Sequence, residues 1–120
     1  MLYLTYEQIL DLHESILTPE NPRGQWEEKV IAIMGNIAGG IGNQLFHPTV
    51  LETGNAYLYY FARAQSFYKG NKRTAVITCA TFLDLNGTAL KYPINTKVVW
   101  DIGKGQMTKD ESLVYLKTIT

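Results

Sequence analysis

Three cationic side chains, Lys69, Lys72 and Arg73, surround a turn at Gly70 and Asn71. Glycine and asparagine are residue types that a chain uses where the backbone must turn tightly, and the apolar run after them predicts a buried helix. The first N–H groups of a helix have no partner within it, and the helix dipole adds partial positive charge at the same end. Together with the three cations, this junction predicts a binding site for anionic oxygen, above all phosphate.

Helices on both sides must position this turn. Before it, residues 49–65 carry apolar and aromatic side chains on nearly all faces, which is typical of a central, enclosed helix. These aromatic residues are interpreted as core and not as a base-stacking surface, because no basic stripe accompanies them. Arg63 is the exception, a charge placed to border the turn. After the turn, a helix over residues 72–86 ends at Asn86 and Gly87, a pair typical of a left-handed cap.

Four further helices complete the expected fold. One runs from Thr5 to about Leu17 and begins with the spacing of a capping box, and another covers residues 26–37. Two more start at Asn95 and at Thr108, the second again with capping-box spacing. The sequence therefore predicts an all-α, compact helical bundle, a single domain over residues 1–120 with room for one short hairpin.

Composition limits the kind of protein this chain can be. With 46% hydrophobic residues in a chain of 120, one core can be buried. A formal net charge of zero argues against wholesale attraction to a polyanion, so no nucleic acid is expected as a partner. No apolar run approaches the ~20 residues of a membrane span, and Cys79 has no second cysteine to pair with. We therefore expect a cytoplasmic protein without a membrane partner.

Two histidines are the side chains able to exchange protons near neutral pH. His13 lies on or beside the buried stripe of the first helix, where a histidine is more often a hydrogen-bonded core residue than a catalyst. His47 precedes Pro48 in an expected loop and is interpreted as an ordinary exposed residue.

Segment 65–75, Gln-Ser-Phe-Tyr-Lys-Gly-Asn-Lys-Arg-Thr-Ala, resembles the signature of the Fic/Doc family, His-x-Phe-x-Asp-(Gly/Ala)-Asn-Lys-Arg. Its ending is similar to that of the death-on-curing (Doc) branch. The resemblance extends in order from residues 4–16 to residues 82–87. It implies a bundle of the Fic/Doc type, a flap over residues 42–49 that docks a target, and a histidine at His13 that faces the active-site region.

The resemblance also implies a function. Doc-like proteins are toxins of type II toxin–antitoxin systems, and a small antitoxin protein holds each in check. Enzymes of this family transfer a phosphate or nucleotidyl group from ATP to a hydroxyl of a translation factor such as elongation factor Tu. Carried over by position, Gly70 makes the turn, Asn71, Lys72 and Arg73 hold phosphate, and Phe67 anchors the loop in the core.

Two positions depart from the signature. Gln65 stands where the family has the histidine that acts as general base, and an amide cannot take up a proton. Lys69 stands where the family has the acidic residue that holds Mg²⁺, and an ammonium cannot ligate a cation. No metal ligand is therefore expected here, although Lys69 could itself neutralise a phosphate oxygen. His13 is a candidate replacement for the base.

Three hypotheses stay open. The chain is an active toxin in which Lys69 replaces the metal and another group replaces the base. Alternatively, it is a pseudoenzyme that binds ATP, another nucleotide or a protein partner without turnover. In the third hypothesis it is a helical adaptor with no nucleotide site, and the turn is only a capped loop with its charges in water.

Overall fold

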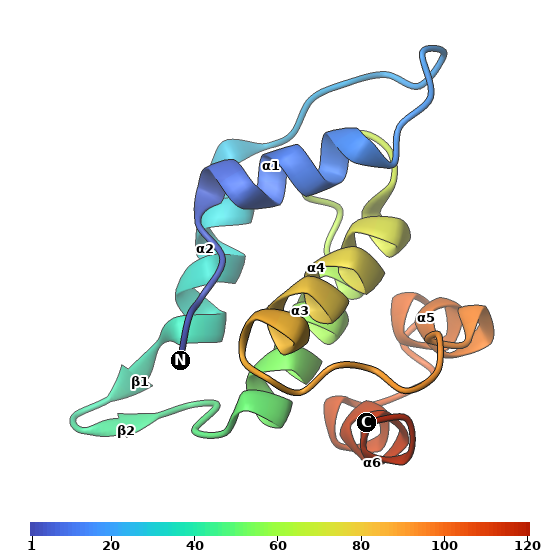
Figure 1. Ribbon diagram of the computed structural model, residues 1–120. Helices are drawn as coiled ribbons and strands as arrows, with labels where there is room; N and C mark the ends of the chain where they lie inside the picture. The colour runs from blue at the N-terminus through green and yellow to red at the C-terminus, as the bar shows by residue number, and fades with distance from the viewer.

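Two long helices, α3 (Val50–Arg63) and α4 (Asn71–Leu85), run side by side through the centre of the fold. The computed structural model describes residues 1–120. All residues from Thr53 to Leu58 are buried, so α3 is enclosed on nearly every side, as its aromatic composition predicts. The loop that carries the cations joins these two central helices (Figure 1).

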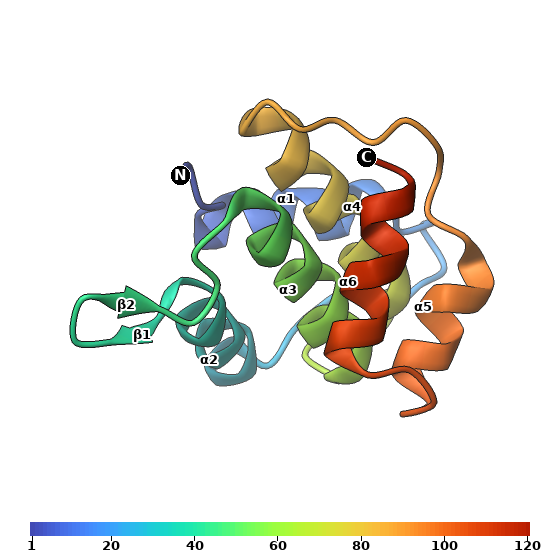
Figure 2. The ribbon, with the colours of Figure 1, turned by 90° about the horizontal axis from the view of Figure 1, so that it is seen from below.

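Four shorter helices cover the central pair on two sides. α1 (Tyr6–Ser15) packs on α4, and α2 (Glu27–Ala38) packs on α3. On the other side lie α5 (Thr96–Gly103), which contacts both central helices, and α6 (Lys109–Thr118), which contacts α3 (Figure 2). None of these helices has the length and apolar character that crossing a bilayer requires.

Local signals at the helix ends are confirmed. Thr5 and Thr108 each form a capping box, with Gln8 and Glu111 as the reciprocal partners. In both boxes the threonine hydroxyl accepts a backbone N–H while the longer side chain accepts the N–H of the cap. Gly87 has a φ of 80° directly after the last turn of α4, as expected of a left-handed cap.

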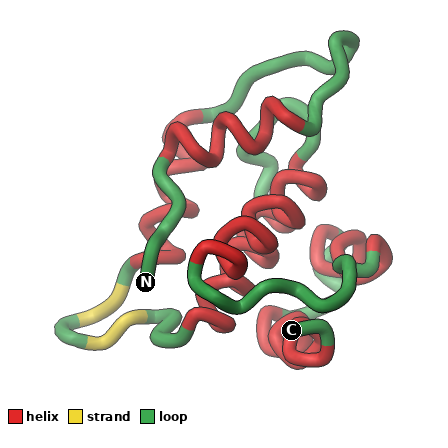
Figure 3. The backbone as a smooth tube through the Cα atoms, in the orientation of Figure 1, coloured by secondary structure: helices red, strands yellow, loops and turns green.

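The one hairpin lies between α2 and α3. Strands β1 (Gly40–Ile41) and β2 (Gln44–Leu45) pair antiparallel, and the turn contains Gly42 with a φ of 61°. Figure 3 shows this hairpin extending away from the helices. The expected fold class is confirmed, a compact and mostly helical globule with one short hairpin.

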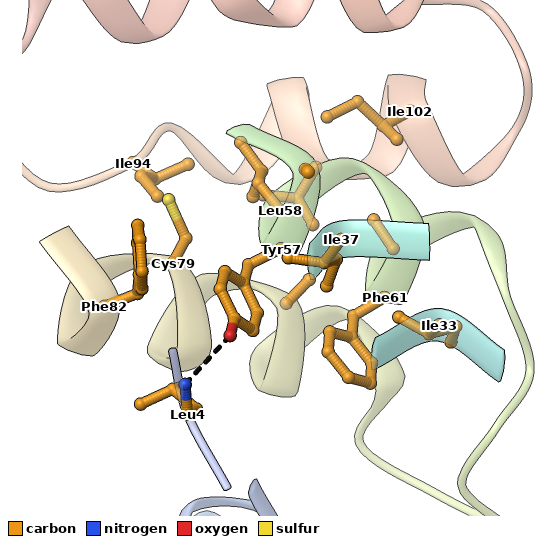
Figure 4. Packing of buried hydrophobic residues seen from close by; sticks show 14 of the residues in the cluster. Leu4, Ile33, Ile37, Tyr57, Leu58, Phe61, Cys79, Phe82, Ile94 and Ile102 are labelled. Carbon is orange, nitrogen blue, oxygen red and sulfur yellow. Dashed lines mark hydrogen bonds between the residues drawn. The ribbon is translucent and has the colours of Figure 1, made fainter. Parts of the chain in front are cut away.

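The core lies where α3 and α4 face each other and the flanking helices. Figure 4 shows Tyr57 packed beside Phe82, with its hydroxyl accepting a hydrogen bond of 3.0 Å from the backbone N–H of Leu4. Burial raises the pKa of the Tyr57 phenol, which keeps it neutral. Cys79 is fully enclosed in the same cluster, and burial raises the pKa of its thiol to about 12.

His47 corrects the prediction of an exposed residue. Its side chain is only 4% exposed. Nδ1 donates to the carbonyl O of Ile37 at 3.1 Å, and Nε2 accepts from Lys109 Nζ at 3.2 Å. Burial lowers the pKa of His47, and the charge of Lys109 lowers it further. The prediction was wrong because contacts with Ile37 of α2, Tyr60 of α3 and Lys109 of α6 surround a position that the local pattern leaves open.

Candidate phosphate-binding cleft

Gly70 makes the turn before α4, with φ 81° and ψ 24° in the left-handed region. It caps the helix without a side chain, and the first backbone hydrogen bond of α4 runs from Thr74 N–H to Gly70 O at 2.9 Å. The N–H groups of Asn71, Lys72 and Arg73 precede this bond, so the helix offers them no acceptor. The start of α4 therefore presents backbone donors together with the positive end of the helix dipole.

Asn71 closes the loop before the helix with both ends of its amide. Its Oδ1 accepts from the Phe67 N–H at 3.0 Å, and its Nδ2 donates to the Phe67 carbonyl at 2.9 Å. Phe67 is completely buried, which fixes this end of the loop to the core. The Asn71 side chain thus shapes the loop in this structure, and the groups free to meet a phosphate are the backbone N–H groups and the cations.

The connection between α1 and α2 fastens the loop from outside. Trp26 N–H donates to the Ser66 carbonyl at 2.9 Å, and Tyr68 N–H donates to the Gly24 carbonyl at 3.1 Å. These bonds flank an antiparallel bridge between the two segments. The rings of Trp26 and Tyr68 also pack edge to face, 4.6 Å between centroids. Backbone pairing of this kind keeps the loop in one conformation.

His13 supports the loop from behind. Its ring is 2% exposed, stacks on Phe67 at 3.9 Å between centroids, and places Nε2 2.7 Å from the carbonyl O of Lys69. A carbonyl only accepts, so Nε2 carries the proton in this bond. Of the two interpretations left open for His13, this geometry favours the hydrogen-bonded core residue, because a nitrogen that donates cannot take a proton from a substrate.

A cleft of about 550 Å³ opens beside the start of α4. That volume lies within the range of small-molecule sites, roughly 300–1,000 Å³. Every predicted site residue except His13 lines the cleft, namely Arg63, Gln65, Lys69, Gly70, Asn71, Lys72 and Arg73. Four of these carry positive charge, and no acidic side chain is among the lining residues. The cleft is therefore an anion-attracting site by its own charges.

Helix α5 supplies a wall that sequence reasoning missed. Lys72 Nζ lies 4.4 Å from the centre of the Trp100 ring, a cation–π contact. Gly103 also lines the cleft, and a Cβ there would come within 3.1 Å of Lys72 Cε. Arg63 reaches the same helix, with Nη1 3.5 Å from the Ile102 carbonyl. The sequence signal for this wall was Trp100, which lies on the side of α5 opposite the buried Val99 and Ile102.

The residues present do not fit the Mg²⁺ that the family signature implies. Magnesium prefers carboxylate and other oxygen ligands in octahedral geometry. The acidic position of the signature is Lys69, and the cleft has no acidic lining residue. Nor does the chain bring three His, Cys, Asp or Glu side chains together anywhere as a metal site. The cleft presents ammonium and guanidinium groups where a metal would need oxygen ligands.

Fold and cleft define a class of protein, a helical globule with a cationic site where a buried helix starts. A model described as the Fic/DOC family matches residues 3–83, which include α1 to α3, the loop and most of α4. The chain therefore belongs to the Fic/DOC family. Comparison with curated proteins finds no match. Helices α5 and α6 lie beyond the matched residues, although α5 lines the cleft.

Proposed function

We propose that this Fic/DOC protein binds ATP or a related nucleotide by its phosphates, in the cleft at the start of α4. The observation that carries the proposal is the concentration of Arg63, Lys69, Lys72 and Arg73 around one cleft that contains no acidic side chain. Charge-assisted hydrogen bonds to phosphate are roughly twice as strong as neutral ones. The uncapped N–H groups after Gly70 add donors at the same place.

The geometry favours binding over efficient transfer, which is the pseudoenzyme hypothesis. Gln65 is exposed at the cleft but has no proton to exchange near neutral pH. His13 uses Nε2 to hold the Lys69 carbonyl. General-base assistance typically contributes about 10²–10⁴-fold, so a site without it holds nucleotide and turns it over slowly.

A second candidate function is the Doc-like toxin. The observation in its favour is the segment from Asn71 to Ala75, which keeps the Doc-like ending of the motif and begins α4, with its first three residues lining the cleft. In this case a small antitoxin would restrain the chain, and the target would be a translation factor such as elongation factor Tu. Phosphoryl transfer relies mainly on positioning and charge neutralisation, so Lys69 would have to supply what the metal supplies elsewhere.

Isothermal titration calorimetry with ATP tests the binding proposal. We expect saturable binding that Arg73→Ala weakens by about 10–100-fold, since a hydrogen bond to a charged group contributes about 1.5–3 kcal/mol. Arg23→Ala is the matched control, because Arg23 pairs with Glu14 on the surface and does not line the cleft. Absence of ATP binding by the folded protein, or equal loss in both variants, would contradict the proposal and leave the adaptor hypothesis.

A transfer assay separates the two nucleotide-binding hypotheses. The protein is incubated with labelled ATP and a cell extract, beside the double variant Gln65→His/Lys69→Asp. A pseudoenzyme gives no labelled protein, and the double variant gains labelling because the base and the acidic group are restored on the same scaffold. Labelling by the natural sequence, together with growth arrest on expression, would instead support the toxin.

A further inference from the structure

The charges that face the cleft all have one sign. Arg63, Lys69, Lys72 and Arg73 line it, and no aspartate or glutamate does. In a site built around a metal-bound nucleotide, protein oxygens meet the metal and cations meet the phosphates. Here only the second kind of group is present, so every charged side chain at the site competes with a metal for the same phosphate oxygens.

Two of these cations contact α5. Lys72 Nζ rests 4.4 Å from the Trp100 ring centre, and its Cε passes close to Gly103, where a Cβ would lie 3.1 Å away. Arg63 Nη1 lies 3.5 Å from the Ile102 carbonyl. A side chain packed as Lys72 is loses less rotamer freedom when it binds an anion.

The backbone of Lys69 is fixed as well. His13 Nε2 donates to its carbonyl at 2.7 Å, while its side chain is exposed at the cleft. The ammonium therefore starts from a defined point on the loop, next to the uncapped first turn of α4. A cation therefore stands at the motif position where the family signature has its acidic metal ligand.

We propose that the cleft takes the nucleotide as its metal-free polyphosphate anion, so that Mg²⁺ weakens binding instead of supporting it. This inference rests on the proposed nucleotide-binding function and goes further by naming the ionic form of the ligand. Mg²⁺ on a polyphosphate cancels about two of its negative charges and occupies oxygens in a shell of its own waters. Both effects reduce the attraction that four protein cations exert.

The test is calorimetry of the intact chain with ATP, once in EDTA and once with MgCl₂ in excess over the nucleotide. NaCl brings both buffers to the same ionic strength, because salt alone screens exposed charges. We expect the dissociation constant to rise by about tenfold or more in Mg²⁺, as neutralising about two ligand charges should weaken several ion pairs. This measurement uses the natural sequence, so its outcome does not depend on the folding of a variant.

A pair of variants then assigns the effect to the loop. Lys69→Asp provides a carboxylate where the family has its metal ligand, and we expect Mg²⁺ to strengthen ATP binding to this variant. Lys91→Asp makes the same change of charge at an exposed position outside the cleft, and we expect Mg²⁺ to weaken its binding as in the natural sequence. If Mg²⁺ strengthens ATP binding to Lys69→Asp but weakens binding to Lys91→Asp, Lys69 is the group that makes binding sensitive to Mg²⁺.

The outcomes are distinguishable. Binding that is equal or tighter in Mg²⁺ at matched ionic strength overturns the inference and leaves nucleotide binding standing. No binding under either condition removes the proposed function and the inference together. An identical response of both aspartate variants to Mg²⁺ would show that net charge, and not position 69, controls the effect, which also overturns the assignment.

Discussion

His13 and Lys69 are joined by a hydrogen bond of 2.7 Å from the ring Nε2 to the backbone carbonyl, between α1 and the loop before α4. The His13 ring is buried behind the loop and stacks on Phe67. A histidine 56 residues before Lys69 in the sequence thus holds the Lys69 backbone in place. We therefore expect His13 to support function by positioning the loop, and not by exchanging protons.

Substitution of His13 tests that role. His13→Ala removes the ring and the bond, and we expect a loss of about 2–4 kcal/mol in unfolding free energy together with weaker ATP binding. His13→Gln keeps a donor within reach of the Lys69 carbonyl, so ATP affinity should change by less than about tenfold. Urea unfolding and calorimetry measure the two effects. If His13→Gln kept ATP binding but abolished a transfer activity of the natural sequence, the ring would be a base.

Gly70→Ala should damage both the fold and the cleft. A side chain at φ 81° costs about 1–2 kcal/mol, and its Cβ would lie 3.3 Å from Ile16 Cδ1. Ile16 would have to give by a few tenths of an ångström, and the left-handed backbone would be strained, so we expect ATP affinity to fall by about tenfold or more. Gly35→Ala is the control, because Gly35 lies within α2 and a Cβ there meets nothing within 4 Å. The unfolding free energy of that variant, measured by thermal unfolding, should rise by up to about 1 kcal/mol, and its affinity for ATP should be unchanged.

The burial of His47 beside Lys109 predicts a pH dependence of stability. The pKa of His47 is lowered in the fold by burial and by Lys109, which outweigh the hydrogen bond to Ile37 and the attraction of Glu52. The unfolded chain therefore takes up a proton at higher pH, near 6.5, than the folded chain does. Stability is highest above about pH 6.5 and falls as the pH drops through the lowered pKa of the folded state.

Urea unfolding between pH 5 and 8 measures this effect. His47→Asn keeps a donor for the Ile37 carbonyl and removes the titrating ring. Carboxylates change the unfolding free energy mainly below about pH 5. Between pH 5 and 8, the difference in unfolding free energy between the natural sequence and His47→Asn therefore reports the titration of His47. If the unfolding free energy of the natural sequence falls no more steeply with decreasing pH than that of His47→Asn, the pKa of His47 is not lowered in the fold.

Tyr57→Phe should destabilise the core without affecting the cleft. The Tyr57 hydroxyl is the acceptor for the buried N–H of Leu4, at 3.0 Å. Phenylalanine leaves that N–H unpaired, at an expected cost of about 1–3 kcal/mol. Tyr59→Phe is the comparison, because Tyr59 is only partly buried and its hydroxyl can bond to water. Equal urea midpoints for the two variants would show that the Leu4 bond contributes nothing.

Local patterns predicted the helices well and the cleft only in part. The capping boxes at Thr5 and Thr108 act within one turn, so three or four residues suffice to read them. The tight turn at Gly70 was predicted from residue type alone, and the structure shows it in the left-handed region. The contact of Lys72 with Trp100 joins residues from α4 and α5, and no spacing in the sequence encodes it. The burial of His47 against Tyr60 of α3 and Lys109 of α6 likewise depends on tertiary packing, which no local pattern encodes.

Cys79 gives the protein a built-in reporter of its own opening. It is the only thiol of the chain, it lies fully enclosed in α4, and its pKa of about 12 keeps it almost entirely as the unreactive thiol near neutral pH. A thiol reagent can modify it only in molecules whose central helices have separated. The rate of alkylation would thus report how often the core opens transiently. A nucleotide that binds at the start of α4 and stabilises the closed state should slow it.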